Sequence, residues 1–200
     1  MVPEATASIL RCRRGWIGVL TDQIQQLFNH LIQVELNSAY LYLAMSTYFL
    51  RMNLPGMATW LRLQHDEERG HAQQLMNYVV DRGGTVEVRA IPAQPVNFGS
   101  PLEAWQQVLK HEQYVTQNYQ QAYDMVSKAQ DYQSLPIIQD FLREQIDEVA
   151  QATVIVGQLQ MARDNSAAIL LLDRELGQRN GAAAPAGAAP APAPAPAPAG

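Results

Sequence analysis

The 200-residue sequence predicts an all-α fold: a four-helix bundle with one long crossover between its second and third helices and a short fifth helix. Three observations lead to this prediction. From Thr21 to about Asn165, apolar residues recur at steps of three and four, with almost no β-type alternation. Turn signals divide this span into four long segments. The middle connection is much longer than the other two, and connection length decides how neighbouring helices run.

The first two helices are expected to form an antiparallel hairpin. The first opens with Thr21 as its N-cap and runs to about Met52. Asn53 and Pro55 mark the turn into the second helix, which ends near Arg82, just before two C-cap glycines at 83 and 84. Because the turn has only a few residues, the two helices should lie side by side in opposite directions.

The third and fourth helices are expected to form a second hairpin. Residues 100–103, Ser-Pro-Leu-Glu, have the pattern of a capping box with proline at the first helical position, so the third helix starts there and fades near Ala129. Ser134 and Pro136 start the fourth helix, which lasts to about Asp164. The short apolar segment 167–176 predicts the fifth helix.

The connection from residue 83 to residue 100 decides the topology. A long helix should span about 45 Å at a rise of about 1.5 Å per residue. The extended connection reaches about 55–60 Å. It is therefore long enough to pass along the whole bundle, which makes the second and third helices parallel.

Three regions follow from this pattern: a flexible extension at 1–20, a helical domain at 21–178 and a disordered Ala/Pro-rich tail at 179–200. Repeated Ala-Pro blocks helical hydrogen bonding and offers no core, so the tail should be extended. The apolar patch within the first 20 residues is too short for the h-region of a secretory signal.

Composition excludes several classes of function. A net charge of −5 and a pI near 5.3 provide no basic stripe for nucleic acid. No apolar run approaches the roughly 20 residues of a membrane helix. The single cysteine, Cys12, allows no internal disulfide and favours a reducing compartment, the cytoplasm.

The inward face of each long helix carries one glutamate near its middle. These residues interrupt otherwise apolar stripes, and His71 lies one turn after the second of them: Glu35, Glu68, Glu112 and Glu148. Removing each carboxylate from water costs several kcal/mol, and four together repel one another or take up protons. No lysine or arginine occupies the matching positions, whereas two divalent cations would neutralise the four charges. The sequence therefore predicts a pair of metal ions.

The ligand types narrow the choice of metal. Four carboxylates and one imidazole form an oxygen-rich set that suits iron or manganese better than structural zinc. A single glutamate on an apolar face is commonly a solvated edge residue. Four at one depth, with a histidine one turn away, indicate a site.

Four stretches resemble helices of the ferritin family, specifically the haem-free bacterial ferritins. They are VELNSAYLYLAMS (34–46), HDEERGHAQQLMNYV (65–79), HEQYVTQ (111–117) and EQIDEVAQ (144–151), and the resemblance covers about residues 22–178. It implies a ferroxidase centre in which Glu35, Glu68 and His71 hold one iron. Glu68 would bridge to a second iron held with Glu112 and Glu148.

The resemblance also assigns secondary roles. Gln145 matches a glutamine that forms hydrogen bonds or acts as a weak ligand, and Tyr42 matches a tyrosine that donates an electron or orients a ligand. Glu67, Glu144 and Asp147 match acids of an accessory third iron site. Asp147 stands where a glutamate is usual, and the shorter arm leaves that site's geometry open, the alternative being a solvated acidic face.

Two departures separate the chain from the haem-binding bacterioferritins. The fourth helix has no second Glu-x-x-His, and Arg69 stands where those proteins place the haem-binding methionine, so no haem is expected. The implied protein oxidises Fe(II) with O2 or H2O2 and stores Fe(III) as mineral in a homo-oligomeric cage of 24 subunits. Two alternatives stay open: a diiron oxidase of an organic substrate, and a structural bundle that binds metal without catalysis.

Overall fold

The computed structural model describes residues 19–179, and apart from their inner ends the expected N-terminal extension and Ala/Pro-rich tail lie outside the described residues. Within the described range the chain is all-α, as predicted, and contains no strand. The five helices are α1 (Asp22–Arg51), α2 (Pro55–Asp81), α3 (Pro101–Lys128), α4 (Leu135–Ala162) and α5 (Ser166–Leu176).

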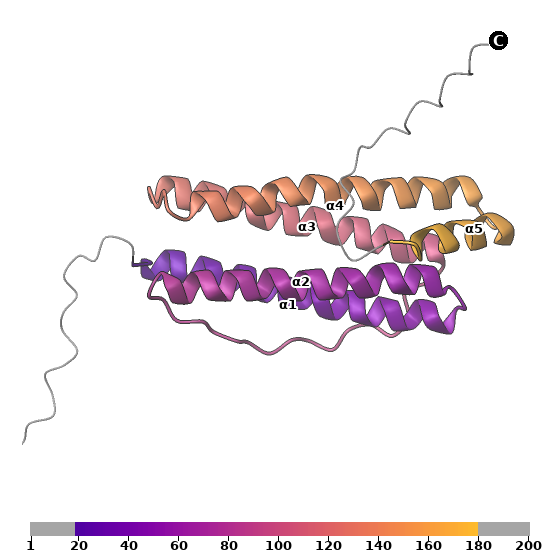
Figure 1. Ribbon diagram of the computed structural model, residues 1–200, viewed down its shortest axis with the longest axis horizontal. Coiled ribbons are helices and arrows are strands. Elements are labelled where there is room, and N and C mark those ends of the chain that lie inside the picture. Colours follow the sequence, from indigo (N-terminus) through magenta and orange to yellow (C-terminus); the bar gives the residue numbers. More distant parts are fainter. Residues whose placement is uncertain (1–18, 180–200) are drawn as a thin grey trace, which may run out of the picture.

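Two hairpins pack together into the bundle (Figure 1). One is α1 with α2 and the other is α3 with α4. The connection from α2 to α3 runs along the outside of the first hairpin for the length of the bundle, so α2 and α3 are parallel, as its reach predicts. Asn29 on α1 anchors this connection through its side-chain amide. The amide nitrogen donates to the backbone carbonyl of Thr85 at 3.0 Å, and the amide oxygen accepts from the backbone N–H of Glu87 at 2.8 Å.

Local signals in the sequence set the helix ends. The Thr21 hydroxyl accepts from the amide of Ile24, and Ser100 and Glu103 form the predicted capping box. Gly83, with φ of +68°, adopts the left-handed conformation that follows many helices. The boundaries lie within two residues of those predicted.

The apolar core consists of two clusters, one toward each end of the bundle. Along each long helix the chain passes from one cluster, through its inward glutamate, into the other. The four glutamates therefore form a polar layer between two apolar regions.

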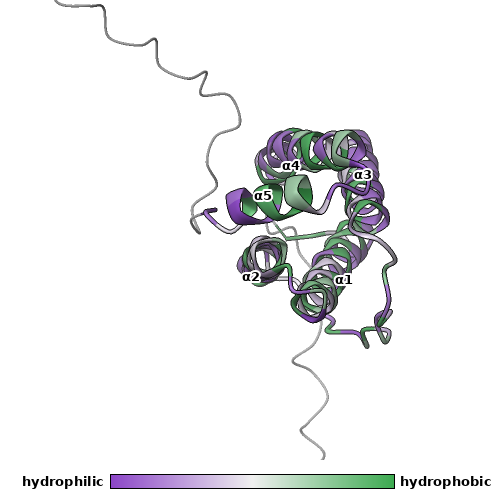
Figure 2. Ribbon diagram, turned by 90° about the vertical axis from the view of Figure 1, so that its right-hand side faces the viewer, coloured by the Kyte–Doolittle hydropathy of each residue, from purple (hydrophilic) through white to green (hydrophobic). Residues whose placement is uncertain are grey.

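The fifth helix packs at the start of α2 (Figure 2). The first turn of α2 receives no side-chain cap from its own N-cap residue, Leu54. Instead the buried carboxylate of Asp173 on α5 accepts from the backbone amide of Met57 at 2.8 Å. Gly56 allows this approach, because a Cβ there would stand 1.6 Å from the carbonyl oxygen of Asp173.

Among residues 19–179, no helix combines the length and the apolar character that crossing a membrane requires.

Candidate metal centre

The four inward glutamates are all buried. Glu35, Glu68, Glu112 and Glu148 are between 1% and 5% exposed. Each is contributed by a different long helix, because each sits on the inward stripe of a helix that is apolar above and below it. The polar layer predicted from the sequence is thus present.

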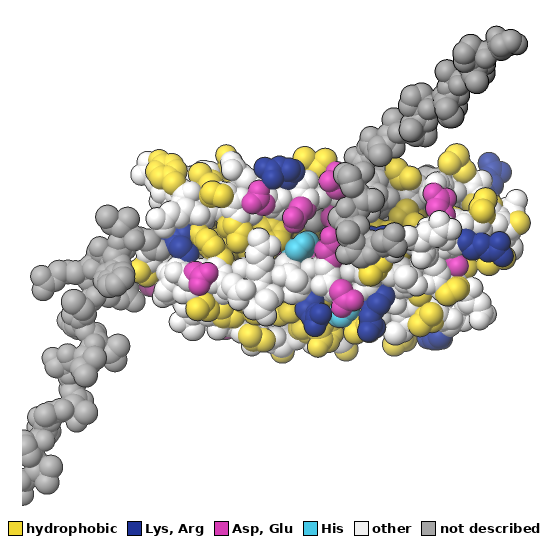
Figure 3. Space-filling model, viewed as in Figure 1, with side chains coloured by type: hydrophobic (Ala, Val, Ile, Leu, Met, Phe, Trp, Pro, Cys, Tyr) yellow, Lys and Arg dark blue, Asp and Glu magenta, His cyan; other side chains and the backbone are white. Residues whose placement is uncertain are grey.

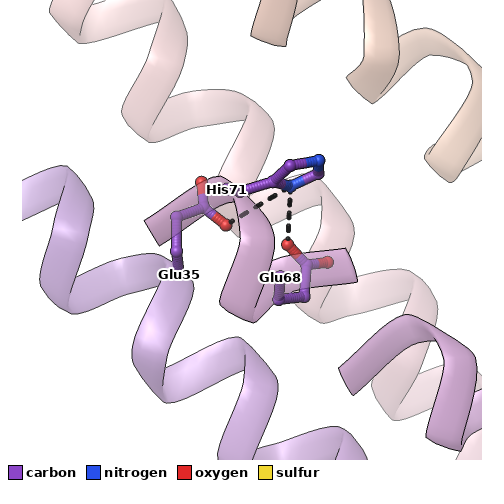
Figure 4. Close-up of side chains that lie close together, drawn as sticks. All are labelled: Glu35, Glu68 and His71. Atoms are coloured by element: carbon purple, nitrogen blue, oxygen red, sulfur yellow. Dashed lines mark hydrogen bonds and ion pairs between the residues drawn. The ribbon is translucent and has the colours of Figure 1, made fainter. Parts of the chain in front are cut away.

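Three of the predicted ligands form a compact group (Figure 4). Glu35, Glu68 and His71 each offer one ligand atom, and these atoms lie within 4.8 Å of one another. Nδ1 of His71 is 3.1 Å from Oε2 of Glu68 and 4.0 Å from Oε2 of Glu35. Glu68 and His71 face the same way because residues three apart in a helix share a face.

Glu112 and Glu148 lie outside this compact group but interact electrostatically with Glu68. Burial, followed by the charges of Glu68 and Glu148, raises the pKa of Glu112 well above its usual value. Burial and the charge of Glu68 raise the pKa of Glu148 to about 7. Gln145, on the turn preceding Glu148, accepts a hydrogen bond from Thr116 at 3.0 Å and is itself buried.

Three carboxylate oxygens in this layer have free lone pairs. The buried Oε2 atoms of Glu35, Glu112 and Glu148 find no hydrogen-bond partner among the described residues. An unpaired buried acceptor costs about 1–3 kcal/mol, so such atoms call for a partner. Divalent cations would provide one, and this oxygen-rich donor set fits iron or manganese.

Two tyrosines donate hydrogen bonds to the other oxygen, Oε1, of two of these carboxylates. Tyr42 on α1 donates to Oε1 of Glu112 on α3, and Tyr119 on α3 donates to Oε1 of Glu35 on α1. Periodicity predicts only that Tyr119 faces inward, and gives it no role in the site. Each tyrosine lies seven residues after the glutamate of its own helix, and that repeated spacing was a signal for both.

His71 offsets part of the negative charge. Burial opposes ionisation of Glu68, but the hydrogen bond to His71 and the charge of that ring outweigh it, so the pKa of Glu68 is lowered. In turn, burial lowers the pKa of His71 less than its contacts with Glu68 raise it. Burial and the charge of Glu68 raise the pKa of Glu35 well above its usual value. Glu68 therefore favours ionisation, whereas the other three buried acids favour the protonated state.

The three accessory acids are placed differently from one another. Glu67 forms an ion pair with Arg179 at 2.8 Å. Oε2 of Glu144 lies 3.5 Å from Nε2 of His71, across the gap between α2 and α4, whereas Asp147 is exposed on α4. Figure 3 shows acidic side chains around a histidine on this face. Within residues 19–179, these acids do not form a second compact ligand group.

Comparison with protein-family models matches residues 25–162 to the model described as "Ferritin-like domain". Among curated proteins, a bacterial non-heme ferritin of Bacteroides fragilis is 35% identical over 161 residues, covering 80% of this chain and all of the relative. A bacterial non-heme ferritin of Staphylococcus aureus is 32% identical over 161 residues, covering 80% and 97%.

Solved structures agree with these matches. The open-pore ferritin of the archaeon Archaeoglobus fulgidus superposes with a TM-score of 0.79 at 34% identity, covering 80% of this chain and 99% of that one. A ferritin of the green alga Ulva pertusa superposes with a TM-score of 0.78 at 30% identity, covering 81% and 88%. The predicted resemblance is thus confirmed, and the Glu-Glu-His group is compatible with a ferroxidase centre.

Proposed function

Because this chain belongs to the ferritin family, we propose that it is a ferroxidase that oxidises Fe(II) at a diiron centre and stores Fe(III) as mineral inside a protein cage. Glu35, Glu68 and His71 hold one iron. Glu68 bridges to a second iron, held with Glu112 and Glu148. Gln145 lies beside the second iron as a hydrogen-bonding or weak ligand.

One observation carries this proposal: three buried carboxylate oxygens with free lone pairs belong to acids that interact electrostatically with Glu68, which is the acid that favours ionisation. A cation at Glu68 would satisfy these oxygens and remove the cost of burying them. Two ferrous ions would bring the four carboxylates to neutrality.

The iron is substrate, and the chain positions two ions so that their electrons leave together. Each Fe(II) gives up one electron, and the pair reduces O2 to H2O2, or H2O2 to water, with uptake of two protons. Tyr42 orients Glu112 by its hydrogen bond. The protein's contribution is proximity and fixed charge.

The mineral requires a container, and we propose a homo-oligomeric cage of 24 subunits in the cytoplasm. Large apolar side chains remain exposed on the outer faces of the described domain, including Tyr40 on α1, Val88 on the crossover and Leu171 on α5. Exposed apolar side chains on several faces suit contacts with more than one neighbour.

Oxygen consumption tests the ferroxidase assignment. On addition of two ferrous ions per chain, wild-type protein should consume oxygen rapidly. Glu68→Ala, which removes a ligand from both irons, should fall to the rate of iron in buffer, whereas the exposed-site control Glu175→Ala should behave as wild type. A wild-type protein that oxidises iron only at the buffer rate would indicate a metal-binding bundle without catalysis. A Glu68→Ala protein that retains the fast rate would place the centre elsewhere.

A further inference from the structure

Arg179, two residues beyond the C-cap of α5, reaches back to the edge of the metal centre. One guanidinium nitrogen donates to Oε1 of Gln64 at 2.8 Å, and another donates to Oε2 of Glu67 at 2.8 Å. The guanidinium carbon lies 4.4 Å from the centre of the Trp60 ring. The side chain is only 11% exposed, so Arg179 places a fixed positive charge beside α2.

Gln64 connects this charge to the centre. Gln64 is fully buried, and its amide nitrogen donates to Oε1 of Glu68 at 3.1 Å. Because Arg179 binds the carbonyl end of the Gln64 side chain, the amide end is directed toward Glu68. Arg179 therefore contacts one acid next to the centre directly and the bridging acid through one intermediate residue.

We propose that Arg179 is a resident cation on the outer side of the metal centre, and that a metal ion can use Glu67 only after the guanidinium has left. The inference rests on the proposed function, because it concerns ions added beside a metal-loaded Glu68. In the resting protein Arg179 and a metal ion compete for the same carboxylate. The segment after α5 thereby limits the number of ions that each chain holds.

The competition follows from charge and geometry. A hydrogen bond between arginine and carboxylate is charge-assisted and stronger than a neutral one. A second cation at Glu67 would also be repelled by a guanidinium within a few ångströms. Removing the arginine should therefore raise the affinity for the outermost ion about tenfold.

Titration of the metal-free, full-length protein with Zn²⁺ tests this without any redox step. The variant Arg179→Gln keeps a hydrogen-bonding side chain but loses the charge. By calorimetry it should bind one further ion per chain, or bind the outermost ion about tenfold more tightly than wild type. The matched control is Arg174→Gln, which removes the same charge from the exposed face of α5 and should titrate as wild type. Adding Glu67→Gln to Arg179→Gln should abolish the gain.

An Arg179→Gln protein with wild-type stoichiometry and affinities, or with weaker outer binding, would overturn the competition. A gain that survives Glu67→Gln would also overturn it, because the extra ion would then not depend on Glu67. These results leave the proposed function standing if Glu68→Ala still removes the inner ions. Wild-type protein without any Zn²⁺ bound at Glu68 would instead contradict both proposals.

Discussion

Tyr119 on α3 donates a hydrogen bond from its phenolic hydroxyl to Glu35 on α1. The reverse bond, from α1 to α3, runs from Tyr42 to Glu112. In both pairs the phenol takes Oε1 and leaves Oε2 buried with its lone pairs free. The two tyrosines thus bind two buried carboxylates in the same way, and we infer that Tyr119 positions Glu35 as Tyr42 positions Glu112.

Tyr119→Phe should shift metal binding to higher pH. The hydrogen bond from Tyr119 lowers the pKa of Glu35, against the larger raising effects of burial and of Glu68. Without it, the pKa rises further and protons compete with metal over a wider range. Zn²⁺ affinity measured across pH should show this shift in Tyr119→Phe and not in Tyr123→Phe, elsewhere on α3. An unchanged pH midpoint would reduce Tyr119 to a packing residue.

Glu148→Gln should flatten the pH dependence of stability in the metal-free protein. The pKa of Glu148 is about 7 in the folded protein, raised by burial and by Glu68, whereas an unfolded glutamate has a pKa of about 4.3. Between these values the folded state holds a proton that the unfolded chain has released. Stability therefore falls as pH rises through this window, by up to roughly 4 kcal/mol from this group.

Thermal melts of chelator-treated protein between about pH 5 and about pH 8 measure this slope. Glu175→Gln, at an exposed position on α5, is the control and should keep the wild-type slope. Equal slopes for Glu148→Gln and wild type would show that Glu148 does not hold a proton in the folded, metal-free state.

Bound metal should reverse the sign of the pH dependence of the protein's stability. Carboxylates must lose their protons to bind an ion, so metal affinity increases with pH. Binding to the folded state alone adds stability in proportion to the logarithm of that affinity. Protein with saturating Zn²⁺ should therefore melt at higher temperature as pH rises from about 5 to about 7. Parallel slopes with and without Zn²⁺ would mean that the buried acids do not bind it.

Gly56→Ala should displace α5 from α2. Its Cβ would collide with the backbone of Asp173, so the cap on the Met57 amide would be lost. Loss of a helix cap typically costs about 1 kcal/mol, and the disrupted packing adds to that cost. The matched control is Gly157→Ala on α4, where a Cβ meets nothing within 4 Å and helix propensity favours alanine by about 1 kcal/mol. Urea denaturation should show opposite shifts, and equal shifts would refute the contact.

Periodicity and capping residues predicted the helices because each signal acts locally. Thr21 and the Ser100 capping box accept hydrogen bonds from free backbone amides at the starts of their helices, and Gly83 follows the end of α2. Each acts on residues only a few positions away in the sequence. The buried layer of acids was also predictable. An inward stripe fixes which residues face the core, and equal depth along four helices places them together.

Contacts between distant segments were not predictable in this way. Periodicity indicated that Tyr119 faces inward, but not that its hydroxyl meets Glu35. The cap supplied to α2 by Asp173 depends on where α5 docks. Arg179 follows the last helical pattern and was assigned to the tail, so its pair with Glu67 emerged only from the folded arrangement.

We infer that the acids of all four helices together hold a pair of iron ions. Crystals loaded with Fe(II) without oxygen, with diffraction recorded at the iron absorption edge, locate these ions. Two anomalous peaks per chain, about 3.5–4 Å apart, are expected. One should lie between Glu35, Glu68 and His71, and the other between Glu68, Glu112 and Glu148. Iron found only at surface acids, or a single ion in the buried layer, would show that the four buried acids do not hold an iron pair.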